Sequence, residues 1–415
     1  MRMTYIILLL INLLVFPTFA QVEYEIPEPD YIKTITFKSN TSEGELPVLK
    51  LNETLTLEFD VLNADESDFY YVIEHYDFDW KPSRLKKLEF LDGFDNQRIV
   101  NYENSFNTYQ IYSHYTLQIP NNQTRLKVTG NYMIKIFDDY GEIVFSRKFM
   151  VYEELAQVGV SIKRSRNVKF IQQTQSVDFF ISSPVLRFNN PEQTVKTVVI
   201  QNNNLNTAIT DLKPMYMLGR ELIYKYDTES SFWGGNEYLF FENKDVRSAN
   251  VGVQFIDLQD VYHSYLFTDI IRADRPYTYN PDINGNFLIT VLDRENAAIE
   301  ADYTVVHFSL QHPELMGENI YIYGNYNNYA LNDSNRMTFN TDSDLYEKTM
   351  LMKQGFYNYK YVIINKLGEL EEGAISGNFD VTENNYKVLV YYRDLGARYD
   401  QIVGLGEGTS LKISN

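Results

Sequence analysis

The 415-residue chain has a formal net charge of −19 and no cysteine, and it contains 34 tyrosines and 26 phenylalanines. So acidic a chain disfavours a nucleic-acid partner, and the lack of cysteine excludes disulfides, a thiolate nucleophile and cysteine-ligated metals. At roughly 100 to 200 residues per domain, the length predicts two to four domains. The aromatic content favours strands over helices.

Residues 1–20 have the pattern of a cleavable secretory signal peptide. Arg2 precedes an almost wholly apolar run from Ile6 to Phe16, and Ala20 supplies a small residue at the expected cleavage position. The run is shorter than the roughly 20 residues of a typical spanning helix, and no later stretch is comparably apolar, so no direct membrane insertion is expected. Cleavage after Ala20 leaves a net charge of −19 − 1 = −20, because Arg2 is removed.

Residues 21–153 are expected to form a first β-sandwich domain, because short alternating runs are separated there by clusters of Asn, Asp, Gly and Pro. The Asp138–Gly141 cluster predicts a hairpin turn between two of these strands. The expected strands are Thr34–Phe37, Thr54–Val61, Phe69–Phe78, Tyr132–Phe137 and Ile143–Val151. The whole chain is predicted to be all-β, with tandem immunoglobulin-like or early-set β-sandwiches.

One strand of this first domain carries a His-Asp-Asp alternation. His75, Asp77 and Asp79 fall on one face of an extended strand, and imidazole with carboxylates suits a divalent metal. Successive positions on one face lie roughly 6.5 to 7 Å apart, so joint chelation requires a bend. We favour a structural or solvated face over a metal-dependent hydrolase, with Asp79 capping the turn at Lys81–Ser83.

Residues 154–296 are expected to form the middle β-sandwich domain. Phe232 and Trp233 precede the paired glycines Gly234 and Gly235, which allow tight backbone geometry. The aromatic pair therefore belongs either to an exposed loop tip that anchors a partner or to a hairpin corner closed by aromatic packing. The expected strands are Val158–Ile162, Val177–Ile181, Thr194–Gln201, Glu221–Tyr226, Glu237–Phe241 and Gly252–Ile256.

Residues 297–415 are expected to form the C-terminal domain with a short tail. The segments Ile320–Tyr329 and Gly355–Val362 resemble an early-set immunoglobulin-like domain of the glycogen-binding type. Tyr326 and Tyr329, together with Trp233 of the middle domain, are the candidate sugar platforms, since aromatic faces stack on apolar ligand faces. The family commonly has tryptophan where Tyr329 stands, so core packing is the favoured interpretation of both tyrosines.

Motifs of enzymatic chemistry are missing from the sequence. It has no HExxH pattern, no G-x-S-x-G elbow and no phosphate-binding or dinucleotide glycine motif. We therefore expect no catalytic residue, metal, cofactor or small-molecule substrate.

Several motifs occur in an order and spacing that identify a family. The stretch from Tyr70 to Ile99 contains H-x-D-x-D-W followed by W-x-P-S-x-L, and Gly234–Tyr238, Asp282–Gly285 and Ala301–Tyr303 follow downstream. Together they resemble the type IX secretion system plug proteins. The resemblance implies a noncatalytic periplasmic protein that docks on the periplasmic opening of an outer-membrane β-barrel translocon and occludes its pore. The alternative is a periplasmic glycan-binding module that uses the C-terminal domain.

Overall fold

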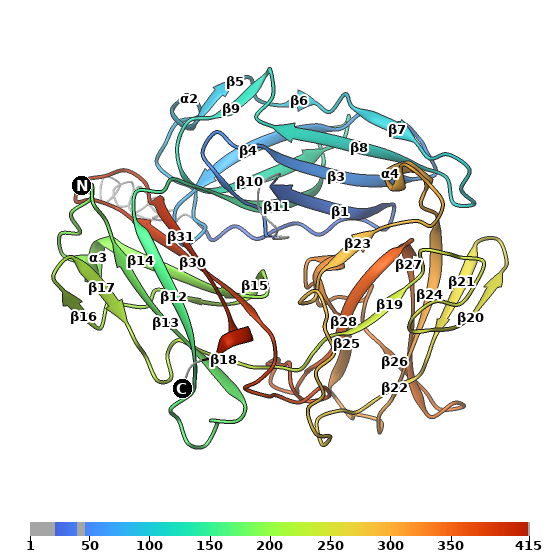
Figure 1. Cartoon of the computed structure of the whole chain (residues 1–415). Helices are drawn as coiled ribbons and strands as arrows, with labels where there is room; N and C mark the ends of the chain where they lie inside the picture. Colours follow the sequence, from blue (N-terminus) through green and yellow to red (C-terminus); the bar gives the residue numbers. More distant parts are fainter. Residues whose placement is uncertain (1–20, 40–45, 414–415) are drawn as a thin grey trace, which may run out of the picture.

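Three hydrophobic cores, each enclosed between two β-sheets, organise the residues that the computed structural model describes, 21–39 and 46–413. We call the three sandwiches modules 1, 2 and 3. Figure 1 shows module 1 at the top, module 2 at the left and module 3 at the right, around a common centre. The prediction of tandem β-sandwiches is confirmed, whereas the expected signal peptide lies outside the described residues.

Module 1 packs the sheet β1-β3-β8-β7 against the strands β11-β10-β4-β6. All five predicted strands of this region form, and β10 and β11 join through the expected turn, in which the N–H of Gly141 donates to the carbonyl oxygen of Asp138. Its elements are β1 (Ile32–Ser39), β2 (Val48–Lys50), β3 (Leu55–Leu62), β4 (Tyr70–Tyr76), α2 (Lys87–Phe90), β5 (Leu91–Gly93), β6 (Gln97–Arg98), β7 (Tyr102–Asn104), β8 (Tyr112–Ile119), β9 (Thr124–Leu126), β10 (Gly130–Phe137) and β11 (Ile143–Tyr152).

Module 2 packs the sheet β12-β13-β17-β16 against β15-β14-β30-β31. Its elements are β12 (Gln157–Arg164), β13 (Thr174–Ser182), α3 (Pro191–Thr194), β14 (Val195–Gln201), β15 (Asn204–Thr210), β16 (Tyr216–Leu218), β17 (Glu221–Tyr224), β18 (Ser231–Trp233), β30 (Asn385–Tyr392), β31 (Gln401–Thr409) and the 3₁₀ turn η2 (Ser410–Lys412).

Module 3 packs β19, β23, β25 and β29 around β28, against the sheet β20-β21-β24-β27-β26. Its elements are β19 (Leu239–Glu242), β20 (Val253–Leu258), β21 (Tyr262–Leu266), β22 (Asp269–Ile270), β23 (Phe287–Ile289), α4 (Ala297–Glu300), β24 (Tyr303–Gln311), β25 (Asn319–Tyr323), the 3₁₀ turn η1 (Asn325–Asn327), β26 (Thr338–Asn340), β27 (Leu345–Lys353), β28 (Gly355–Ile364) and β29 (Leu370–Glu371).

The strands do not divide at the boundary expected between 154–296 and 297–415. β19 and β23 pair with β28 in module 3, although they precede residue 297, while β30 and β31 return to pair with β14 in module 2. The difference has a physical reason: alternation along one strand reveals its buried face but not the distant strand that completes its sheet.

Close packing in module 2 depends on glycines in its last strand. Gly404, Gly406 and Gly408 share one face of β31, and a Cβ atom at any of them would lie within 2.8 Å of an atom of β12 or of the residue preceding it. The missing side chains let β12 cross directly over β31. One parallel pair, Tyr152 with Ile402, then continues this sheet into β11 of module 1.

A buried carboxylate joins modules 1 and 3. Asp60 on β3 is fully buried, and its Oδ2 accepts hydrogen bonds from Lys353 Nζ and from the hydroxyl of Tyr303, both at 2.6 Å. His114 Nδ1 lies 2.7 Å from the other oxygen. The Lys353 ammonium also donates to the carbonyl oxygen of Ala298 and lies 4.1 Å from the ring centroid of Tyr112. We call Asp60, Lys353, Tyr303 and His114 the Asp60 node.

Asp60→Asn is expected to destabilise the protein by about 3 to 5 kcal/mol, because it leaves the buried Lys353 ammonium without a counter-charge. Burial already lowers the pKa of Lys353. Urea unfolding measures the loss, and Glu154→Gln, which removes the exposed ion pair with Lys50, is the matched control with no measurable effect. Asp60→Leu combined with Lys353→Met should recover much of the loss, and wild-type stability of Asp60→Asn would contradict the role of the node.

Candidate interaction surfaces

His75 is a buried structural residue near the end of β4. Its side chain is 3% exposed, with Nδ1 2.8 Å from the hydroxyl of Ser83 and Nε2 3.1 Å from the carbonyl oxygen of Thr129. The ring of Tyr132 meets the imidazole edge-on at 4.8 Å between centroids. Burial lowers the pKa of His75 to about 4, so the imidazole is neutral at pH 7 and both nitrogens are occupied.

The two aspartates of the alternation diverge from His75 because β4 ends at Tyr76. Asp77 pairs with Arg393 of module 2 at 2.5 Å. Asp79 accepts hydrogen bonds from the backbone and the ammonium of Lys81, which is the turn cap expected from the sequence. Among the residues that the structure describes, no group of three His, Asp or Glu side chains is placed to hold a metal ion.

The recognisable segment around β4 instead contacts module 2. Asp400 accepts a hydrogen bond from the backbone N–H of Phe78 at 2.9 Å and lies 3.1 Å from Arg393. The hydroxyl of Tyr391 donates to the side chain of Asn131 at 2.7 Å. The stretch with the strongest sequence signature therefore forms an internal junction between modules 1 and 2.

Tyr329, a predicted partner-binding and sugar-platform candidate, is buried between modules 2 and 3. It is 2% exposed, and its hydroxyl donates to the carbonyl oxygen of Asn202 at 2.9 Å. Nearby, Asn204 donates to the hydroxyl of Tyr323 at 2.9 Å. Tyr329 offers no free ring face to a ligand, because module 2 covers the loop that carries it.

Tyr326, the second candidate in that loop, is partly buried against the core of module 3. Its hydroxyl donates to the carbonyl oxygen of Ile322, and its ring meets Tyr357 edge-on. Both contacts lie within module 3, which agrees with the core-packing interpretation of this tyrosine.

The neighbouring aromatic residues Phe232 and Trp233 differ in burial. Phe232 is buried against Tyr386 in the core of module 2, whereas Trp233 is 46% exposed and meets Phe170 edge-on. Trp233 borders a cleft of about 310 Å³ between modules 2 and 3. The pair thus combines both interpretations drawn from the sequence: one ring closes a corner and the other is accessible.

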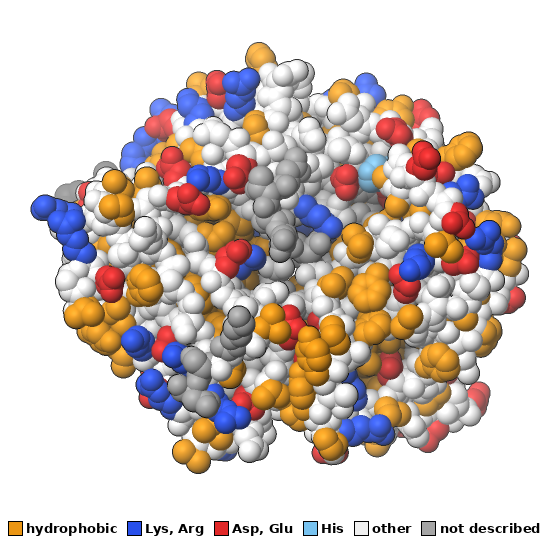
Figure 2. Space-filling view, in the orientation of Figure 1, with side chains coloured by type: hydrophobic (Ala, Val, Ile, Leu, Met, Phe, Trp, Pro, Cys, Tyr) orange, Lys and Arg blue, Asp and Glu red, His pale blue; other side chains and the backbone are white. Residues whose placement is uncertain are grey.

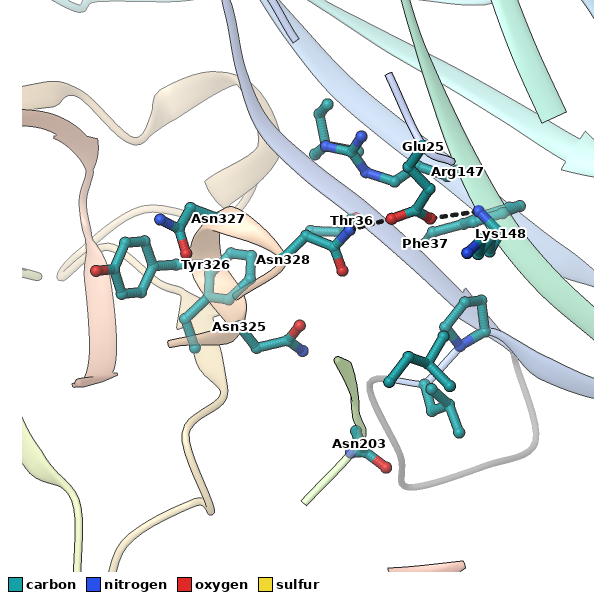
Figure 3. Close-up of a pocket in the computed structure, with 15 residues that line it drawn as sticks. Glu25, Thr36, Phe37, Arg147, Lys148, Asn203, Asn325, Tyr326, Asn327 and Asn328 are labelled. Carbon is teal, nitrogen blue, oxygen red and sulfur yellow. Dashed lines mark hydrogen bonds between the residues drawn. The ribbon is translucent and has the colours of Figure 1, made fainter. Parts of the chain in front are cut away.

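Polar contacts cross the centre where the three modules meet. Figure 3 shows Glu25 bridging two modules: one carboxylate oxygen accepts from the side chain of Asn328 at 2.6 Å, and the other accepts from the backbone N–H of Lys148 at 2.5 Å. Arg147 and Glu28 form a second pair at 2.6 Å. A cavity of about 50 Å³ lies beside Glu25 and Arg147, and a larger one of about 280 Å³ is also lined by Glu25, Lys148 and Asn328.

The outer rim of module 1 carries exposed apolar side chains that sequence reasoning missed. They lie on or between α2, β5, β6, β7 and β8, which follow the top of Figure 1, and Figure 2 shows hydrophobic and charged side chains interspersed there. The residues are Leu88, Phe94, Val100, Phe106, Tyr109 and Ile111. The sequence alone does not show that an apolar residue in a connecting segment is exposed, because it does not show whether a neighbouring element covers that residue. We call these residues the module 1 rim.

Comparison with known proteins identifies relatives. Residues 32–153 match the family described as the first domain of the type 9 secretion system plug protein. The crystal structure of a hypothetical protein from Parabacteroides merdae is 32% identical, covers 94% of this chain and 100% of its own, and has a TM-score of 0.90. An alkylpurine DNA glycosylase from Pseudomonas fluorescens reaches a TM-score of only 0.16 at 11% identity over 29% of each chain, too low to indicate a shared fold.

None of the curated protein sequences compared matches the chain. Within the ranges that the structure describes, no helix has both the length and the apolarity needed to cross a membrane.

The lowered pKa of His75 predicts a defined acid sensitivity. The unfolded imidazole, with a pKa near 6.5, binds its proton more tightly than the folded one, so stability falls as the pH drops from 6.5 toward 4, by up to about 3 kcal/mol. In urea unfolding, His75→Gln should lose this part of the pH dependence. At pH 8 the difference in unfolding free energy between wild type and variant measures only the contacts that the substitution removes. If unfolding free energy falls in parallel for the two proteins from pH 8 to pH 4, His75 is not the source of the acid sensitivity.

Tyr329→Ala should destabilise the protein by about 3 to 5 kcal/mol, because it empties a buried aromatic site at a junction. Trp233→Ala, at an exposed ring, should cost about 1 kcal/mol or less. Urea midpoints measure both losses, and equal losses would mean that exposure does not separate the two aromatics.

Proposed function

The chain belongs to the type IX (type 9) secretion system plug protein family, and from this premise we propose that it is a noncatalytic periplasmic plug. In this proposal it docks on the periplasmic opening of the outer-membrane β-barrel translocon and occludes the pore when no cargo is exported. The family description names a plug protein of the type 9 secretion system, and the periplasmic docking and the occlusion of the pore are our extension of that name to this chain.

The observation that carries the proposal is the joining of three sandwiches into one body by buried polar contacts. The Asp60 node joins modules 1 and 3, the ion pair of Asp77 with Arg393 joins modules 1 and 2, and Tyr329 joins modules 2 and 3. A stopper must keep its shape against the opening that it closes. Buried polar networks whose groups are satisfied rigidify a structure and specify one arrangement of its parts.

A plug acts through contact area and not through a reaction centre. A stable protein interface buries roughly 800 Å² on each partner, and a few large side chains near its centre, often aromatic, supply most of the energetic anchors. The module 1 rim offers such residues, and module 1 is the region that matches the family description. We therefore assign the rim as the docking face of the plug.

Affinity purification of the tagged translocon from cells that make this protein tests the proposal. The wild-type chain should be recovered with the translocon, and a variant with Leu88→Glu, Phe94→Glu and Val100→Glu should be recovered at least about tenfold less, since charges would enter the contact. Val168→Glu, at an exposed valine of module 2, is the matched control and should be recovered as wild type.

The two parts of the proposal fail separately. Absence of the wild-type chain from the purified translocon would refute docking itself. Normal recovery of the rim variant would refute the rim as the docking face and leave the plug function standing.

A further inference from the structure

Two histidines meet on the outer face of module 3. His263 on β21 and His307 on β24 lie 44 residues apart in sequence, yet Nδ1 of the first lies 2.9 Å from Nε2 of the second. β21 pairs parallel with β24 and sets Tyr265 opposite His307, which brings the two imidazoles side by side across the strands. Figure 1 shows β21 beside β24 at the right of the molecule.

The histidine pair faces solvent and not the core. Ser264 on β21 and Val306 on β24 are buried, whereas His263 and His307, their neighbours along the strands, are partly exposed. Successive side chains of a strand point to opposite faces, so both imidazoles lie on the outer face of the sheet. The pair is therefore open to small ions from solution.

A stack of aromatic rings fixes the position of His307. The ring of Tyr265 lies against this imidazole with 3.9 Å between centroids and 11° between planes, and Phe255 stacks on Tyr265 at 4.2 Å and 9°. The three rings belong to the neighbouring strands β20, β21 and β24. Packing of this kind holds a side chain in one orientation, which prepares its nitrogen for a ligand.

The separation of the two nitrogens matches chelation of a metal. Imidazole suits zinc, copper and nickel, with metal–nitrogen distances of roughly 2.0 to 2.1 Å. Two such nitrogens lie roughly 2.9 Å apart at neighbouring corners of a square plane and roughly 3.3 Å apart in a tetrahedron. The observed 2.9 Å equals the first value, so small ring rotations turn both lone pairs toward one ion. One proton must move, from the nitrogen that donates in the present hydrogen bond to the other nitrogen of the same ring.

Charges around the pair favour a cation. Asp257 of β20 lies directly opposite His263 in the sheet, so its carboxylate shares the outer face. Burial and the neighbouring His263 lower the pKa of His307, and the negative charge of Glu347 opposes them. His307 is therefore neutral at pH 7, the form that binds metals. The other residues directly opposite the two histidines carry no positive charge; they are Val305, Tyr265 and Thr349.

We propose that His263 and His307 form a binding site for a divalent late first-row transition metal ion. Nδ1 of His263 and Nε2 of His307 bind the ion, and water completes its coordination. Cu²⁺ binds more tightly than Ni²⁺ or Zn²⁺, following the general order of affinity for nitrogen ligands, whereas Mg²⁺ prefers oxygen ligands and is not held. This inference goes beyond the plug function and involves no residue of the module 1 rim.

Calorimetric titration of the purified full-length protein, without a polyhistidine tag, tests the inference with Cu²⁺, Ni²⁺, Zn²⁺ and Mg²⁺ in turn. His263→Gln and His307→Gln should each weaken Ni²⁺ binding at least about tenfold, because either change removes one of the two protein ligands. His312→Gln, at a partly exposed histidine outside the pair, is the matched control and should bind as wild type. No Ni²⁺ binding by the wild type, or equal binding by all three variants, would overturn the proposal.

Electron paramagnetic resonance of the Cu²⁺-loaded wild-type protein gives a second readout. Couplings from the imidazole nitrogens should show two imidazoles on one copper ion, and each single variant should show one. The wild-type spectrum needs no variant, so it decides the proposal should His263→Gln or His307→Gln fail to fold. A wild-type spectrum with one imidazole or none would overturn the joint site.

Discussion

The arrangement of the modules depends on a charge that has no access to water. Asp60 is fully buried on β3, and an isolated carboxylate in that position is very costly unless cations and hydrogen-bond donors surround it. Lys353 and Tyr303 of module 3 meet this requirement together with His114 of module 1. Even the local backbone is adapted: Thr34 has a positive φ of 51° at a bulge in β1 and places its hydroxyl 2.6 Å from that of Tyr303. Because β3 and β27 supply opposite charges, modules 1 and 3 stabilise one another.

The same design recurs at the other contacts. A carboxylate from one module accepts hydrogen bonds from the backbone of another: Asp302 of module 3 accepts from Tyr109 and Gln110, and Asp400 of module 2 accepts from Phe78. Such bonds fix the position of a whole segment, because backbone groups cannot rotate away as side chains do. The three sandwiches then behave as one shape-stable body. A body of fixed shape is what the proposed obstruction of an opening requires.

Sequence reasoning recovered the features that depend on local pattern. Alternation located the strands of module 1, the Asp138–Gly141 cluster located its hairpin, and the ordered motifs identified the family. Features that depend on distant packing were not recoverable. The sequence favoured a packed position for Tyr329 but could not show that module 2 is what covers it, and nothing along β30 and β31 shows that they return to β14. The meeting of His263 and His307 was missed for the same reason, because only the pairing of β21 with β24 brings them together.

A plug should reduce the ionic current through the translocon, and pore conductance measures this most directly. The translocon, purified without this chain, is reconstituted in a planar bilayer, and the purified protein is added to the periplasmic side. The open-pore current should fall in a saturable way and return when the protein is washed out. A current that stays unchanged, at protein concentrations where binding to the translocon is complete, would contradict the claim that this protein closes the pore.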